Sequence, residues 1–202
     1  MKIALSLAIV LCIASSMNHK PIISAKMDSV STAQCHQGSA RYDLHIGGTI
    51  EFTNMSNRTL LLPKKIDVVR TFLAASSIEE ALQKKYVFVM NQEFGGSVDV
   101  SVHLEDFVAL KSGANAQAEV EPVVVTVTAD SNSNHSKGFG SGTYWVQLEF
   151  ATIPAAFVFH AKELAVKKKA WRSSGTLEDS YVVTEPFRLD VAPDPKAPAC
   201  DR

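Results

Sequence analysis

The sequence predicts an all-β protein, an antiparallel β-sandwich with one or two short inserted helices. Three observations favour this fold class. Short runs rich in β-branched and aromatic residues recur from Tyr42 onward, turn-forming clusters separate them, and apolar and polar residues alternate within the longer runs. Many short strands with such spacing are typical of sandwiches and barrels. The chain of 202 residues is long enough to bury a core within one domain.

The first residues have the layout of a secretory signal. Lys2 precedes an apolar stretch over residues 3–13, which is too short to span a bilayer. Small residues suited to signal peptidase occur at residues 14–16 and again at residues 23–25. We therefore expect residues 1–25 to hold a signal peptide that is cleaved near 16 or near 25. The mature protein is expected to be secreted or periplasmic, without stable membrane insertion.

The chain is close to neutral, with a formal charge of −1. Removal of residues 1–25 takes away Lys2 and Lys20 and no acidic residue, which moves the charge from −1 to −3. A mildly acidic chain is poorly suited to neutralise phosphates, so no nucleic-acid partner is expected. The one basic cluster would spread around a helix rather than form a stripe. Its members are Lys162, Lys167, Lys168, Lys169 and Arg172.

Export would leave two of the three cysteines, Cys35 and Cys200, one near each end of the mature chain. Disulfides persist in oxidising compartments, and the termini of a domain often lie close together. The sequence therefore predicts a disulfide between Cys35 and Cys200. Two unpaired thiols or metal ligands are the alternatives, but neither cysteine has a second one nearby, as metal-binding spacings require.

The domain boundaries follow from where strand character begins and ends. Residues 26–41 lack periodicity and are rich in small polar types, so we expect an N-terminal lead-in without regular structure. The sandwich domain is expected over residues 42–191. The proline-rich residues 192–202 are expected to form an extended tail.

The elements within this domain each have a local signal. The capping-box spacing of Ser77 and Glu80 predicts a helix over residues 78–85. The Ala- and Lys-rich residues 155–172 favour a helix in their second half. Pro122 lacks an amide donor and is expected at a strand edge or a bulge. The predicted strands cover residues 42–52, 60–62, 67–73, 86–90, 98–110, 116–130, 143–150 and 181–191.

Three asparagines, Asn54, Asn57 and Asn134, lie in N-x-S/T sequons. The first two stand between predicted strands, where asparagine side chains hydrogen-bond nearby backbone and tolerate positive φ. A turn is therefore the preferred interpretation. In a eukaryotic secretory pathway all three would be acceptors for sugar. The short positive segment at the N-terminus favours bacterial export instead, which would leave them as turn residues.

Three stretches punctuate the chain between Tyr42 and Val191. The first stretch, GTIEFTNMSNRTLLL, contains a strand, a polar turn and an apolar strand. The second is the pair LKSG at 110–113 and GTYWV at 142–146. The third is TEPFRLDV at 184–191, the last predicted strand. Together these stretches resemble the immunoglobulin-like sandwich of secreted bacterial proteins, including the BsuPI-type proteinase-inhibitor domains. The resemblance implies an immunoglobulin-like fold and, as a narrower hypothesis, an inhibitor role.

No catalytic, cofactor-binding or metal-binding residue is assigned from the sequence. His103, Asp99 and Glu105 would share one face of a strand and offer a metal two or three ligands. Such a row is more typical of a solvated face. In the loop from Gly138 to Gly142, Phe139 occupies a position where a G-x-S-x-G nucleophile motif requires glycine. This loop is interpreted as a flexible surface segment.

Aromatic residues supply a candidate interaction surface. Tyr144 and Trp145 would point to opposite faces of one strand, so one can enter the core while the other anchors a partner. Together with Phe139 in the preceding loop, they form the predicted interaction surface.

Three hypotheses of function follow. The first is a secreted, non-enzymatic module without a cofactor that binds another, unidentified protein through loops or a sheet edge. The second is an extracellular hydrolase or metal-assisted enzyme with a site around His103, Glu105 and the loop from Gly138 to Gly142. The third is a structural subunit that assembles by strand addition at an exposed edge. The oligomeric state does not follow from the sequence.

Overall fold

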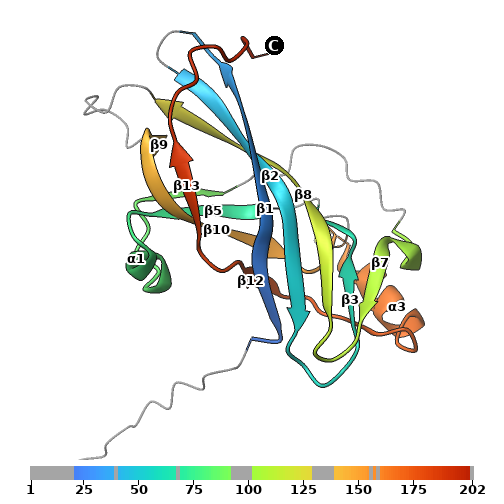
Figure 1. Ribbon diagram of the computed structural model, residues 1–202. Helices are drawn as coiled ribbons and strands as arrows, with labels where there is room; N and C mark the ends of the chain where they lie inside the picture. Colours follow the sequence, from blue (N-terminus) through green and yellow to red (C-terminus); the bar gives the residue numbers. More distant parts are fainter. Residues whose placement is uncertain are drawn as a thin grey trace, which may run out of the picture.

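The computed structural model describes residues 21–38, 41–66, 69–91, 102–128, 139–154, 157 and 160–200 (Figure 1). Within these ranges most residues are in strands, which confirms the prediction of a mostly β protein. The strands form two larger sheets and one smaller sheet. None of the described helices is long and apolar enough to cross a membrane.

The first sheet has the order β1-β2-β8-β4, and β9 also pairs with β8. The pairs β1–β2 and β2–β8 are antiparallel, whereas β4 and β9 run parallel to β8. β1 therefore forms one edge of this sheet. The strands are β1 (Ile23–His36), β2 (Arg41–Asn54), β4 (Lys65–Ile66), β8 (Asn115–Thr128) and β9 (Phe139–Gly140).

The second sheet has the order β12-β10-β5-β6, and β13 also pairs with β10. All of its pairs are antiparallel. β12 and β13 follow one another along the same side of β10, because β5 occupies the other side. The strands are β5 (Val69–Ala75), β6 (Phe88–Asn91), β10 (Gly142–Ala151), β12 (Tyr181–Val183) and β13 (Phe187–Val191).

Side chains from the first and second sheets pack together in the main core. Alternate residues of β2 point inward, as expected for strands with one buried face. Across the core, Phe52 of β2 contacts Phe150 of β10 with ring centroids 5.2 Å apart, and Phe72 of β5 contacts Phe139 of β9 at 5.5 Å. Burial of each such side chain stabilises the fold by about 1.5–3 kcal/mol.

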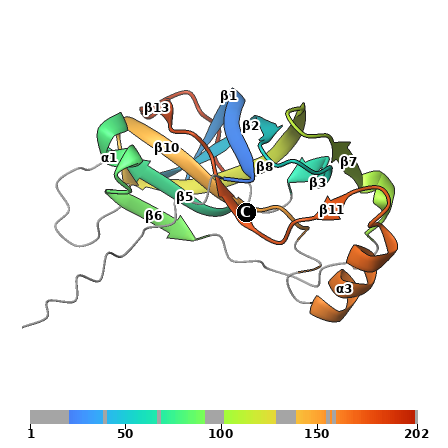
Figure 2. The same ribbon diagram turned by 90° about the horizontal axis from the view of Figure 1, so that it is seen from below.

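A smaller sheet and a helix form a second, smaller core. β11 pairs parallel with β3, and β3 pairs antiparallel with β7. These elements gather at one end of the molecule (Figure 2). The rings of Phe107 in β7 and Trp171 contact each other at a tilt of 59°, with centroids 5.4 Å apart, and the Lys167 ammonium lies over the Trp171 ring. The elements are β3 (Leu60–Pro63), β7 (Phe107–Leu110), β11 (Thr176–Leu177) and α3 (Ala161–Ala170).

The three long strands of the first sheet are irregular at the same level. The β1–β2 register shifts by one residue at Asp28, and the β2–β8 register shifts at Glu121 and Pro122 of β8. Pro122 thus lies at a bulge, which was one of its two predicted positions. Gly48 lies between these shifts with φ +143°, and a Cβ there would lie 2.0 Å from the carbonyl oxygen of Ser29. Bulges of this kind bend a strand locally and increase its twist.

The segment expected to be a lead-in without regular structure is instead β1. Residues 26–36 pair with β2 along their whole length, apart from the shift at Asp28. The prediction was wrong because β1 is an edge strand with exposed side chains from Asp28 to Ala33, so no apolar alternation reveals it. Ile23 and Ala25, inside the range expected for the signal peptide, are also in β1 and are buried.

Two other elements differ from their predictions. The strand expected over residues 98–110 lies partly outside the described residues. In its described part the 3₁₀ helix η1 (Leu104–Asp106) precedes β7, so only residues 107–110 of the expected strand form one. A carboxylate oxygen of Asp106 accepts a hydrogen bond from the His103 amide at 2.7 Å, which fixes this turn. Helix α1 (Ile78–Leu82) is capped by Ser77, as predicted, but ends three residues early. Lys84 has φ +58°, which is incompatible with helix.

A matched pair of glycine substitutions tests the close approach of β1 and β2. Gly48→Ala is expected to lower the free energy of unfolding by about 3 kcal/mol or more, because the new Cβ would strike the backbone of Ser29. Gly113→Ala adds a Cβ at φ +72° with no atom within 4 Å, so about 1 kcal/mol is expected. Urea unfolding of both variants measures the difference, and equal losses would contradict the close packing at Gly48.

Candidate functional site

β1 and the C-terminal segment lie along each other, and a disulfide closes one end of the seam between them. Cys35 and Cys200 are bonded, with 4.8 Å between their Cα atoms, which confirms the predicted pairing. The His36 amide donates to the carbonyl of Pro198 at 2.8 Å, and the Cys200 amide donates to the carbonyl of His36 at 3.1 Å. Closing a loop of 165 residues stabilises the fold by about 5 kcal/mol in the chain-entropy account.

Further hydrogen bonds join β1 to the C-terminal segment along the seam. The Gln34 amide nitrogen donates to the carbonyl of Ala192 at 2.8 Å, and its oxygen accepts from the Asp194 amide at 2.9 Å. Further along β1, the Glu185 amide donates to the carbonyl of Ala25 at 2.8 Å. The edge of the first sheet and the end of β12 are therefore held together at Ala25.

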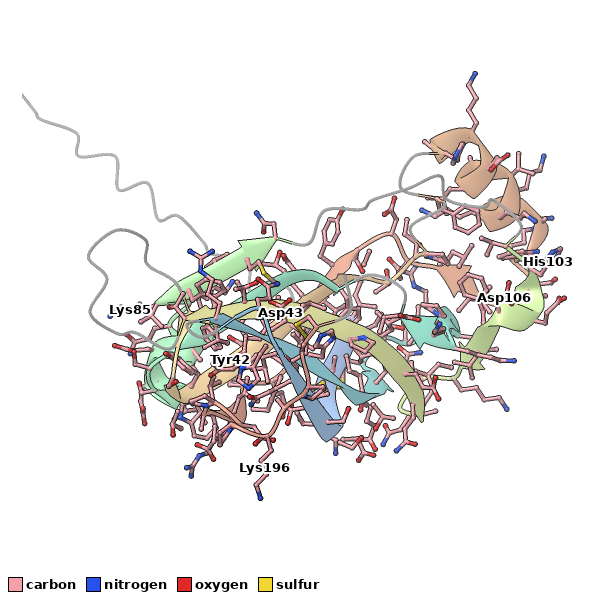
Figure 3. The ribbon with its side chains drawn as sticks, turned by 90° about the horizontal axis from the view of Figure 1, so that it is seen from above. Tyr42, Asp43, Lys85, His103, Asp106 and Lys196 are labelled. Atoms are coloured by element: carbon pink, nitrogen blue, oxygen red, sulfur yellow. A yellow bond between two sulfur atoms is a disulfide. The ribbon has the colours of Figure 1, made fainter. Side chains whose placement is uncertain are left out.

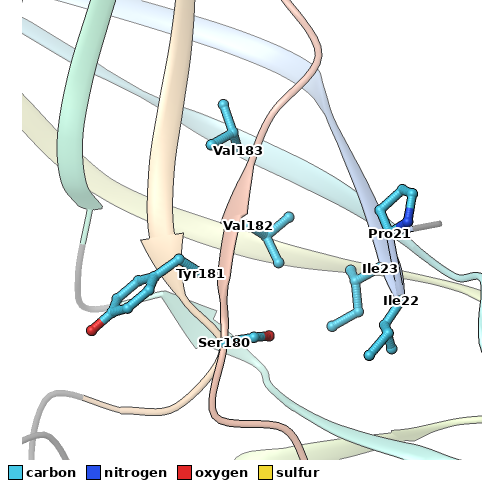
Figure 4. Close-up of a pocket in the computed structure, with 7 residues that line it drawn as sticks. All are labelled: Pro21, Ile22, Ile23, Ser180, Tyr181, Val182 and Val183. Atoms are coloured by element: carbon cyan, nitrogen blue, oxygen red, sulfur yellow. The ribbon is translucent and has the colours of Figure 1, made fainter. Parts of the chain in front are cut away.

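Beyond Ala25, toward the N-terminal end of β1, an apolar groove of about 390 Å³ lies between β1 and β12 (Figure 4). This volume is within the range of about 300–1,000 Å³ that is common for ligand sites. None of the described residues that line the groove is charged. The lining residues are Pro21, Ile22 and Ile23 at β1, and Ser180, Tyr181, Val182 and Val183 at β12.

The floor and the rim of the groove differ in burial. Ile23 and Val182 are buried members of the main core and extend toward each other across the gap in Figure 4. The rim is apolar yet exposed, with exposed fractions of 39% for Ile22, 50% for Tyr181 and 40% for Val183. The groove therefore leads from an exposed apolar rim directly to the core, and exposed apolar patches of this kind often mark interaction sites.

Backbone groups of both edges point into the seam. The Thr184 amide donates to the carbonyl of Leu148, and the Thr152 amide donates to the carbonyl of Ser180. Along an antiparallel strand, residues that bond to the partner strand alternate with residues that face away from it, so the N–H and C=O of Val183 point away from β10. On β1, the carbonyl of Ala25 faces Glu185, so the N–H and C=O of Ile23 face the same side. In the described part of the chain, β1 and β12 do not pair with each other.

The charged residue nearest to this groove along β1 is already paired. The Lys26 ammonium lies 2.9 Å from a carboxylate oxygen of Glu51. This hydrogen bond and the charge of Glu51 raise the pKa of Lys26 above its usual value. Lys26 is thus a cation at neutral pH whose side chain is directed to Glu51 of β2.

The predicted aromatic surface is wrong in one member. Phe139 is buried, and its ring lies 4.4 Å from the Tyr144 ring between centroids. It pairs with Val127 of β8, which turns the side chain into the core. The Tyr144 hydroxyl donates to the carbonyl of Gly140 at 3.0 Å, and Trp145 on the opposite face is half-buried. None of these three residues lines the groove.

The residues of the predicted hydrolase or metal site are only partly described. His103 and Glu105 lie at η1, at the end of the molecule that carries α3 and away from Tyr42 and Asp43 (Figure 3). Asp99 and Gly138 lie outside the described residues. Within the described ranges, one group of three donor side chains lies close enough to hold a metal, Cys35, Asp43 and Cys200. Its two sulfur atoms are bonded to each other and are not thiolates.

Asn54 of the first sequon is part of a turn, as interpreted from the sequence. Its side chain is fully buried, donates to the carbonyls of Arg58 and Leu110 at 2.7 and 2.8 Å, and accepts from the Ser56 amide at 2.9 Å. A sugar on this nitrogen would replace one of its two hydrogens, so at least one of the two donated bonds would be lost. Asn134 lies outside the described residues.

Comparisons of the chain with protein-family models, with curated proteins and with solved structures each found no match.

A pair of asparagine substitutions tests the turn. Asn54→Ala is expected to lower the free energy of unfolding by about 2–3 kcal/mol, because the buried carbonyl of Leu110 and the Ser56 amide lose their partner. Asn57→Ala removes an exposed side chain from the second sequon, and a change within about 0.5 kcal/mol is expected. Thermal or urea unfolding in the oxidised state measures both. A neutral Asn54→Ala would contradict the role of this side chain.

Proposed function

We propose that this protein is an exported, non-enzymatic, immunoglobulin-like module that binds an extended segment of another protein at the groove between β1 and β12. The observation that carries the proposal is the combination of an apolar floor with two sheet edges that do not pair with each other. An added strand can hydrogen-bond to such an edge through its main chain while its side chains enter apolar pockets. The proposal thus joins binding at a sheet edge with strand addition.

The geometry of the groove defines the chemistry of the bound segment. Side chains of an extended peptide alternate between two faces, so residues two apart would point to the floor formed by Ile23 and Val182. These residues should be apolar, because the described lining of the groove carries no charge. The main chain of the segment would accept from the N–H and donate to the C=O of Val183 or Ile23. Recognition would depend on alternating apolar residues more than on charge.

The immunoglobulin-like assignment is supported by two antiparallel-rich sheets that share one core, and by the resemblance of the sequence to secreted modules. Export is supported by the disulfide between Cys35 and Cys200, since such bonds persist outside the reducing cytoplasm. The inhibitor role depends on the resemblance alone. It would be abandoned if serine and cysteine proteases kept full activity in micromolar protein.

Substitution of one edge residue tests the proposed binding mode. Ten-residue peptides would first be selected on the wild-type protein from a displayed random library, and their affinities measured by fluorescence anisotropy. Val183→Pro removes the N–H that faces the groove but leaves the pairing of β12 with β10, because that pairing uses other residues. The Kd of the selected peptides is expected to rise at least tenfold.

Two control variants separate the backbone contribution from other effects. Val183→Ala keeps the amide and shortens the side chain, so a smaller loss of affinity is expected than for Val183→Pro. Val89→Glu adds a charge to an equally apolar, exposed residue on the other edge strand of the second sheet, β6, and should leave the Kd unchanged. Peptides that bind Val183→Pro as tightly as wild type, or that are lost with Val89→Glu, would contradict the proposal.

A further inference from the structure

We infer that the signal peptide is removed after Ser16 and that the mature chain begins at Met17, so that residues 21–25 stay in the folded protein. The inference rests on the export proposed above and concerns which of two candidate sites is cut. The residues Ala14-Ser15-Ser16 and Ile23-Ser24-Ala25 are both candidate sites in the sequence. The structure distinguishes them because the second site is inside β1.

A cut after Ala25 would remove paired and buried residues. Ile23, Ser24 and Ala25 pair with the last three residues of β2, from Asn54 back to Phe52. Ile23 is 3% exposed and Ala25 is 2% exposed. The Met55 amide also donates to the carbonyl of Ile22 at 2.9 Å. Their loss would uncover one end of β2 and the core side chains beneath it.

The same cut would open the seam at the end opposite the disulfide. The carbonyl of Ala25 accepts the bond from Glu185 that joins β1 to the C-terminal segment. Pro21, Ile22 and Ile23 form one wall of the groove. A chain that begins at Lys26 would therefore keep the disulfide but lack both the bond at Ala25 and half of the groove.

The chemistry of the first site also suits signal peptidase better. This protease requires small residues at the last and third-last positions before the cut. Ala14 and Ser16 occupy these positions at the first site, and both are small. At the second site the third-last position is Ile23, a large β-branched residue. Cleavage after Ser16 satisfies the protease and preserves β1, whereas cleavage after Ala25 does neither.

The test is N-terminal sequencing and intact mass of the full-length precursor expressed in a bacterial secretory host. The expected product begins at Met17. Ser16→Leu places a large residue at the last position before the cut, so loss of this product and accumulation of precursor are expected. Ser15→Leu is the matched control, because the second-last position accepts large residues, and its processing should equal that of wild type.

Each other outcome would overturn the inference in a distinct way. A product that begins at Lys26 would show that the folding of β1 does not determine the mature start. A product unchanged by Ser16→Leu would show that the protease does not cut after Ser16. A wild-type chain recovered only with Met1 would contradict export itself. Peptide binding at the groove is measured separately, on purified protein, and does not depend on that last result. A wrong cleavage site and a wrong binding proposal would therefore give different results.

Discussion

The disulfide between Cys35 and Cys200 joins the first described strand of the protein to its last segment, and the rest of the architecture depends on this connection. β1 is an edge strand whose middle residues bury little surface, so it gains few apolar contacts of its own. It is instead held by pairing with β2 on one side and by the C-terminal segment on the other. The covalent bond makes the second attachment permanent in an oxidising compartment. Without it, the second attachment would consist only of the hydrogen bonds at Ala25, Gln34 and His36.

This attachment is uneven along the strand, and the unevenness creates the candidate site. Near the disulfide, backbone and side-chain hydrogen bonds tie β1 to residues 192–200. At Ala25 a single backbone bond joins it to Glu185, and beyond that bond the edges diverge over an apolar floor. Exposed sheet edges are ready to pair with other chains, and proteins commonly blunt them with charges or proline. Pro21 and Lys26 flank the open stretch, which limits it to a few residues.

Much of the fold could be predicted from the sequence because local signals coincide with tertiary roles. Tyr42, Leu44 and Ile46 alternate along β2 and are buried, Ser77 caps α1, and Pro122 lies at a bulge. β1 could not be predicted in this way, because an exposed edge strand has no apolar alternation. Phe139 appeared to belong to a surface loop, but a two-residue pairing with β8 turns it inward. The groove was missed because it forms where residues about 160 positions apart meet between two sheet edges, which no local pattern reveals.

Amide hydrogen exchange of the free, oxidised protein tests most directly whether the seam is closed at Ala25 and open beyond it. The account predicts slow exchange for the amides of Glu185 and Cys200, which donate across the seam. It predicts fast exchange for the amides of Ile23 and Val183, which face the groove, beside slowly exchanging neighbours that pair within the sheets. Strong protection of Val183 and Ile23 in the absence of any partner would show that these edges are already paired, and would contradict a groove that accepts an added strand.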